Sequence, residues 1–415
     1  MPPDITALES ALAGGTMESR LDALKKLCAA APKKPRKGID LHIHTNESFS
    51  VFRSPAEAVW QAVREGVAVL GINDHYTVAG HEEFRKACRI AHIPAVFSME
   101  AVAMDRDAEA KGILTNDPGN PGRTYLCAKA ITRIPPNGSA AMKALSTMQA
   151  ALEQRNREMT RKVRELFPKR VNAEGPSWED VVGLTPRGNA TERHISKAVV
   201  IRLRELAKEL GISIVEAVAQ CCGAQPPSDG DAALQNFVRA KLLKAGAPCF
   251  VDESPEAFLD VGDMRDLFLA FGAVPTYPVL GNPVTGAEEN IPALLDRLEK
   301  MNIFALEVIP QRNTKERMAQ IIDAARARSC PVFNGTEHNT PEPAPLLVPL
   351  ALDPDFLPWF EQSAAVLLGH HREIQAGRPG FVDASGVPAI RDARQRFEHF
   401  RDAGMRSWKE TEALA

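Results

Sequence analysis

Two histidines near the start of the chain, His42 and His44, lie two positions apart within residues 38–44. In a β-strand alternate side chains point to opposite faces, so both imidazoles would share one face with Asp40. The apolar residues between them would face a hydrophobic core. Imidazoles placed in this way either form hydrogen bonds inside the fold or bind a metal ion, and the pair alone does not decide between these interpretations.

Further apolar runs repeat this pattern and indicate the elements that must position such a site. Three of them have polar residues at or shortly after their ends: residues 67–72 with Asn73, Asp74 and His75, residues 95–99 with Glu100, and residues 331–334 with Glu337 and His338. Residues 303–308 are similarly apolar, and helical segments lie between the runs. Residues 54–65, for example, begin with Ser-Pro-x-Glu, a typical helix start. This alternation predicts a parallel β/α architecture, in which an active site forms at the carboxyl ends of the strands.

In combination and order, these segments resemble the motifs of the polymerase and histidinol phosphatase (PHP) superfamily. Residues 40–45 resemble its opening motif, residues 73–80 its second motif, and residues 335–339 its closing Gly-Ser-Asp-x-His motif. The resemblance covers residues 38–134 and 266–344. It implies an α/β fold, a distorted (β/α)7 barrel of TIM-like form, whose strand ends bind one to three divalent metal ions for phosphoester hydrolysis.

The resemblance also implies which residues bind metal and transfer protons. Glu100 stands where the family has a bridging carboxylate. The expected ligands present in this chain are His42, His44, Glu100 and Glu337. Asp74, His75 and His338 would hold or orient a second metal, or accept or deliver the proton in catalysis. Manganese, zinc and iron all suit this ligand set, and we expect one or two divalent ions per chain.

The chain departs from the family at several expected ligand positions. Tyrosines, Tyr125 and Tyr277, stand at two positions where the family has histidine, and the closing motif carries Glu337 for Asp and Asn339 for His. A phenol must lose a proton with a pKa of about 10 before it binds a metal, so we do not expect a full trinuclear site. We expect both tyrosines to point into the barrel mouth and to act on the substrate as hydrogen-bond donors or acids.

Composition limits the class of protein. Of the 415 residues 44% are hydrophobic and 25% charged, as in a globular protein long enough for more than one domain. The net charge of -3 gives no basic surface of the kind that nonspecific nucleic-acid binding needs. No apolar run approaches the length of a membrane helix, and no secretory signal is expected. Seven cysteines without a Cys-x-x-Cys pair suggest reduced thiols and a cytoplasmic location.

The pattern of strands and helices divides the chain into four parts. Residues 1–37 form a helical extension that ends in a basic linker, and residues 38–134 and 266–344 form the barrel. Between the two barrel segments, residues 135–265 lose the strand pattern and are apolar at helical spacing, which predicts an inserted, mostly helical domain. Residues 345–415 form a helical C-terminal extension.

Three residues of this chain are candidates for binding substrate. Arg193 and His194 resemble the Arg-x-His or Arg-Pro-His signature that a helical insert carries in the nucleoside monophosphate or oligonucleotide phosphodiesterase branch of the family. A guanidinium suits a phosphate, although the pair could equally well cap and pack against a helix. Lys129 would share a strand face with Tyr125 and could bind an anionic group.

The sequence therefore predicts a metal-dependent hydrolase, a phosphoesterase that acts on a small, anionic, phosphorylated metabolite or nucleotide. One alternative keeps the metal but acts, as a hydrolase or lyase, on a sugar or carboxylated substrate without phosphate. Another alternative is a degenerate PHP module that binds a ligand without turnover. The retained His42, His44 and Glu100 count against the last alternative.

Overall fold

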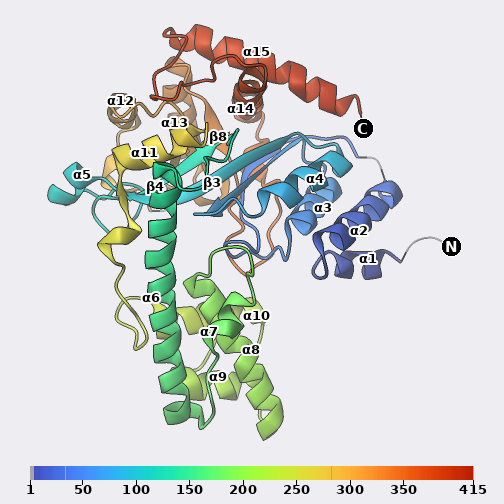
Figure 1. Cartoon of the computed structure of the whole chain (residues 1–415), viewed down its shortest axis with the longest axis vertical. Coiled ribbons are helices and arrows are strands. Elements are labelled where there is room, and N and C mark those ends of the chain that lie inside the picture. Colours follow the sequence, from blue (N-terminus) through green and yellow to red (C-terminus); the bar gives the residue numbers. More distant parts are fainter. Residues whose placement is uncertain (1–3, 33, 282, 415) are drawn as a thin grey trace.

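The computed structural model describes residues 4–32, 34–281 and 283–414, and its centre is a mixed β-sheet (Figure 1). The sheet runs in the order β1-β2-β3-β4-β6-β7-β8, and β5 pairs with β3 beside this path. The strands are β1 (Ile39–Ile43), β2 (Val69–His75), β3 (Ala95–Met104), β4 (Arg123–Lys129), β5 (Leu259–Asp260), β6 (Val274–Val279), β7 (Leu306–Val308) and β8 (Val332–Asn334).

The seven main strands form a nearly closed barrel. The segment after β8 returns to β1, where the amide of Glu337 donates to the carbonyl of His42 over 2.6 Å and the amide of His44 donates to the carbonyl of Glu337 over 2.8 Å. The predicted α/β barrel is therefore confirmed, with one difference. Strand β4 runs antiparallel to both of its neighbours, while the other main strands pair in parallel.

Helices cover the outside of the barrel and bury its main hydrophobic core against the strands. They are α3 (Pro55–Glu65), α4 (His81–Ala91), α5 (Arg106–Ala110), α11 (Val261–Ala270), α12 (Ile291–Lys300) and α13 (Lys315–Ala327), with short 3-10 turns at Pro255–Ala257, Gly286–Glu288, Pro310–Arg312 and Pro349–Leu352. Helix α3 begins as its sequence predicts, because the Ser54 side chain accepts from the amide of Glu57 and a proline stands at the first turn. It ends at Gly66 in a left-handed conformation.

A group of helices leaves the barrel between β4 and β5. It consists of α6 (Ala140–Val171), α7 (Trp178–Val182), α8 (Glu192–Leu210), α9 (Ile214–Cys222), α10 (Asp231–Val238) and a π-helical turn at Arg239–Leu243. The long helix α6 extends away from the barrel, and the shorter helices pack beside it (Figure 1). Residues between Met159 and Cys249 form a second hydrophobic cluster of their own. We call residues 135–258 the insert.

Within the described residues, the two ends of the chain add helices α1 (Ile5–Ala11), α2 (Met17–Ala30), α14 (Leu357–Gln375) and α15 (Ala393–Glu412) to the barrel. Helices α14 and α15 cross closely at Gly369 and Gly404. The absence of a side chain allows this approach, since a Cβ atom at Gly369 would lie 1.9 Å from the carbonyl oxygen of Phe400. Lys33 of the predicted basic linker, residues 1–3 and residue 415 lie outside the described residues. In the described part of the chain no helix has the length and apolarity that crossing a membrane requires.

Candidate metal centre

The histidines of β1 form the centre of the candidate site. The Nε2 atoms of His42 and His44 face each other at 3.1 Å, and Oε2 of Glu100 lies 3.6 Å and 3.5 Å from them. All three side chains are buried. These ring nitrogens and the carboxylate oxygen lie within 4.8 Å of one another, which is the arrangement of a metal-ligand set.

The other ring nitrogen of each histidine is held by a hydrogen bond that orients the imidazole. Nδ1 of His42 lies 2.9 Å from Glu307, and Nδ1 of His44 lies 3.1 Å from the hydroxyl of Ser48. Ser48 in turn donates to Asp74 over 2.6 Å. A proton on each Nδ1 would make Nε2 the atom through which each ring binds a cation, as in zinc sites whose histidines are oriented by a second hydrogen bond.

Charge deep in the site comes from a buried ion pair between β4 and β7, the two strands that flank β6 in the sheet. Lys129 on β4 lies 2.6 Å from Glu307 on β7, and its ammonium also donates to the carbonyl of Leu41 over 2.9 Å. Burial opposes ionisation of Glu307, but Lys129 and His42 lower its pKa to about 2. Burial also disfavours a charged His42, yet Glu307 and Glu100 raise the pKa of His42 to about 10. Carboxylates that stabilise positive charge on this imidazole would equally stabilise a bound metal cation.

His75 brings a third imidazole to the same carboxylate. Its Nδ1 lies 3.1 Å from Oε2 of Glu100, and its ring centroid lies 4.4 Å from that of His44. Burial lowers the pKa of His75, which keeps a lone pair available on the ring. Its side chain is 22% exposed, whereas those of His42 and His44 are fully buried, so His75 is the member of the site that faces the solvent-accessible side.

An amide oxygen without a hydrogen-bond partner among the described residues supports the fit of this site to a cation. Asn73 places its Nδ2 2.9 Å from Nε2 of His42, while its buried Oδ1 has no hydrogen-bond partner among the described residues. Imidazoles, carboxylate and amide oxygen are ligands that divalent transition metals accept. The residues present therefore fit a divalent metal.

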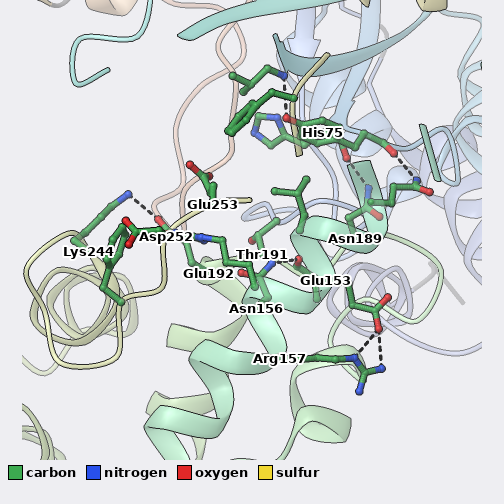
Figure 2. Close-up of a pocket in the computed structure, with 18 of the residues that line it drawn as sticks. His75, Glu153, Asn156, Arg157, Asn189, Thr191, Glu192, Lys244, Asp252 and Glu253 are labelled. Carbon is green, nitrogen blue, oxygen red and sulfur yellow. Dashed lines mark hydrogen bonds and ion pairs between the residues drawn. The ribbon is translucent and has the colours of Figure 1, made fainter. Parts of the chain in front are cut away.

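Two adjoining cavities lie beside the site. The first, which we call the mouth cavity, has a volume of about 300 Å³ and is lined by His75, Glu100, Tyr125, Arg193, Arg312 and Glu337, among others. The second, which we call the cleft, has a volume of about 1040 Å³ and lies between barrel and insert (Figure 2). Both cavities are lined by His75, Tyr125, Thr191, Glu192 and Arg239, so the cleft adjoins the mouth cavity.

Three more of the predicted site residues reach the mouth cavity. Tyr125 lines it from β4, and burial raises the pKa of its phenol, which therefore stays protonated at neutral pH. Arg193 lines it from the start of α8, where its Nη1 donates to Asn236 over 3.2 Å. Glu337 also lines it, but its carboxylate is paired with Arg312 and belongs to no metal-ligand set among the described residues.

The remaining predicted residues lie elsewhere. His194 accepts from the amide of Thr191 over 3.0 Å and caps α8, with its pKa lowered to about 3 by burial. His338 lies between Thr336 at 2.7 Å and the carbonyl of Ala344 at 2.9 Å. Asp74 accepts only from Thr45 and Ser48 in the described structure. Lys129 lies beneath the cavities. None of these four lines the mouth cavity or the cleft among the described residues.

The expectation that Tyr277 points into the mouth is corrected by the register of β6. Thr276 pairs with Cys127, which lies in the barrel interior beside Glu307, so the next side chain along β6 points outward. Tyr277 lines a small space beside Asp105 and Arg297 instead. Burial, followed by the nearby Glu288, raises the pKa of its phenol.

Sequence reasoning did not assign a role to Glu307, Ser48 or Asn73. Of these residues, Glu307 could have been recognised most easily as a site residue, because it is the charged residue in the short apolar strand β7. Ser48 lies four residues after His44, within a loop whose path the sequence pattern does not define.

The fold and the centre described above define a barrel protein with a candidate divalent-metal site. No family model matches the chain, and no curated protein matches it in sequence. Among solved structures it is similar to a presumed metal-dependent phosphoesterase from Bifidobacterium adolescentis, with 18% identity, a TM-score of 0.54, and coverage of 80% of this chain and 98% of that one.

The chain also resembles an amidohydrolase from Chromobacterium violaceum, a structure with bound sulfate and no metal, with 14% identity, a TM-score of 0.49, and coverage of 78% and 95%. At these sequence identities a structural similarity concerns the fold alone. The similarity to the Bifidobacterium adolescentis structure is consistent with the barrel fold of this chain.

Proposed function

We propose that this protein is a metal-dependent phosphoesterase of PHP type. The observation that carries the proposal is the convergence of His42, His44 and His75 on the single carboxylate of Glu100, with His42 and His44 held by further hydrogen bonds. Motif order along the sequence supports the family, and the barrel fold is consistent with it. His42, His44, Glu100 and His75 would hold one or two ions of manganese, zinc or iron.

A divalent ion held by these residues would supply Lewis-acid chemistry, which lowers the pKa of water and polarises phosphoryl oxygens. The chain's own groups then handle the proton and the charge. Burial lowers the pKa of His75, which lines the mouth cavity, so its neutral ring is available as a metal ligand on the substrate side. Tyr125 can donate its phenolic hydrogen to the leaving group or to a phosphoryl oxygen, and Arg193 can bind the remaining oxygens.

The cavities fit a small phosphorylated metabolite or nucleotide. Arg193, Arg239 and Arg312 line the mouth cavity near the ligand set, which suits a phosphate group. The cleft beyond it has room for the rest of the substrate, and its lining has basic and acidic side chains in nearly equal number. A balanced lining suits a small, polar leaving group better than a long polyanion, which a basic groove would favour.

A turnover screen tests this proposal. Purified protein supplied with manganese, zinc or ferrous iron would be assayed on phosphomonoesters, phosphodiesters and lactones. We expect hydrolysis of at least one phosphoester, with kcat/KM lowered more than about 100-fold in His44→Ala, because loss of a group that merely supports a metal ligand already costs about 10- to 100-fold. His399→Ala is the matched control, since this histidine is 47% exposed on α15. Turnover of lactones alone, or equal activity in His44→Ala, would contradict the proposal.

A further inference from the structure

A short segment of the insert contacts the loop that follows β1 and the end of β2, next to the metal-site histidines. The backbone amide of Asn189 donates to the carbonyl of Glu47 over 2.7 Å, three residues after His44. The Asn189 side chain donates to the carbonyl of His75 itself over 2.9 Å. Figure 2 draws both residues, with hydrogen bonds marked as dashed lines. One residue of the insert thus connects both segments.

The next residue of the β2 turn is held by a second insert side chain. Gln149 on α6 donates to the carbonyl of Tyr76 over 2.7 Å. Tyr76 has a φ of 52°, a left-handed backbone conformation that is rare for a bulky residue and needs support from its surroundings. Its hydroxyl accepts from the amide of Val102 over 2.9 Å, which fixes the ring while Gln149 fixes the backbone.

Close approach and charge keep the segment in place. A Cβ atom at Gly188 would lie 1.8 Å from the carbonyl oxygen of Glu47, so only glycine allows this contact without displacing the backbone. Arg187 pairs with the buried carboxylates of Glu47 and Glu83, and Glu83 also pairs with Arg20 of α2. The insert is therefore anchored at the loop that follows β1.

His75 needs this support more than the other histidines do. His42 and His44 are fully buried, and each is oriented through its Nδ1 atom by Glu307 or Ser48. His75 is partly exposed, and among the described residues no hydrogen bond holds its Nε2 atom. Its backbone is what places its Nδ1 atom against Glu100.

We propose that Gln149 and residues 187–189 of the insert, which we call the clamp, position His75 for metal binding. These are positioning residues, because they act through the backbone of His75 and Tyr76 and not on the substrate. Metal affinity would then depend on docking of the insert against the barrel. This inference rests on the proposed function, because it assumes that the site binds a divalent metal.

Cobalt titration of the full chain, followed by visible absorbance, tests the clamp. The variants are Gly188→Ala, which adds one methyl group at the contact, and the double variant N189A/Q149A, which removes two side-chain donors. We expect Co²⁺ affinity to fall about 10- to 100-fold with a changed absorbance spectrum, as for loss of groups that orient metal ligands. The matched control is Gln362→Ala, which removes a hydrogen bond from a side-chain amide to the backbone carbonyl of Pro358 within α14.

Hydrogen exchange on the metal-free proteins gives a second readout. We expect the amides around His75 and Tyr76 to exchange faster in both clamp variants than in wild type, with thermal unfolding still cooperative. If both variants fold and bind Co²⁺ with the affinity and spectrum of wild type, the proposed role of the clamp is wrong, while the proposed metal site still stands. Wild-type protein that binds no Co²⁺ would overturn the proposed function as well.

Discussion

The ammonium group of Lys129 lies 2.6 Å from a carboxylate oxygen of Glu307 inside the barrel, and neither side chain is exposed to solvent. The other oxygen of Glu307 faces Nδ1 of His42 at 2.9 Å. A buried cation, a buried anion and a candidate metal ligand thus form one connected row. The pair connects stability of the barrel to orientation of the metal site.

Breaking this pair should be costly. Lys129→Met leaves Glu307 without its main cationic partner, and Glu307→Gln leaves Lys129 uncompensated. We expect each to lower the free energy of unfolding by about 3–5 kcal/mol, and the double variant K129M/E307Q to recover part of that loss. Urea denaturation measures the free energy of unfolding of each variant, with the same dependence on urea concentration (m value) applied to all of them.

An exposed ion pair supplies the control for that experiment. Arg394 and Glu398 on α15 are 80% and 42% exposed, and Arg394→Ala should cost about 0–1 kcal/mol. Equal losses for Lys129→Met and Arg394→Ala would show that the buried pair has no special weight in the fold.

The two tyrosines should behave differently. Tyr125 lines both cavities, so Tyr125→Phe should lower kcat about 10-fold or more while metal content stays unchanged, because only the hydroxyl is removed. Tyr277 lies on the outer face of β6, so Tyr277→Phe should leave kcat within about two-fold of wild type. Steady-state kinetics and elemental analysis of both variants check this. Metal loss in Tyr125→Phe would make that tyrosine a ligand instead.

A buried histidine far from the cavities should make the fold sensitive to acid. His370 on α14 donates from Nε2 to the carbonyl of Gly272 and accepts at Nδ1 from the amide of Phe381, each over 2.9 Å, so its ring is neutral. Burial lowers the pKa of His370 to about 4. The unfolded chain binds the proton first as pH falls below about 6.5, so stability declines from there to pH 4.

The expected contribution of His370 over that interval is about 3 kcal/mol. Urea unfolding at pH 7 and pH 4.5 would be compared for wild type and His370→Asn. The variant should be less stable at pH 7 and should lose less on acidification. If the free energy of unfolding falls by the same amount between pH 7 and pH 4.5 in both proteins, groups other than His370 cause the acid sensitivity.

Part of the site could be read from the sequence because alternation in a strand is a local property. His42 and His44 share a face for that reason, and Glu100 ends a recognisable apolar run. The structure places His75 with them, at the end of β2. These positions follow from strand periodicity, which a single sequence reveals, and from the strand arrangement expected of a β/α barrel.

Other parts depend on contacts between distant segments. The antiparallel direction of β4 is not encoded in its own residues, and the outward position of Tyr277 follows from the pairing of β6 with β4. Glu307 meets Lys129 and His42 only after the barrel closes. The sequence left two readings of His194 open, and the cap at Thr191 favours the structural one.

Metal content is the most direct test of the account. Wild-type protein, His42→Ala and His44→Ala would be purified without chelator, loaded with manganese or zinc, desalted and analysed for metal per chain. The account predicts one or two tightly held ions in wild type and a sharp loss in either variant, because the Nε2 atoms of both histidines face the same point beside Glu100. Wild-type protein that holds no metal after loading, or variants that hold as much as wild type, would contradict it.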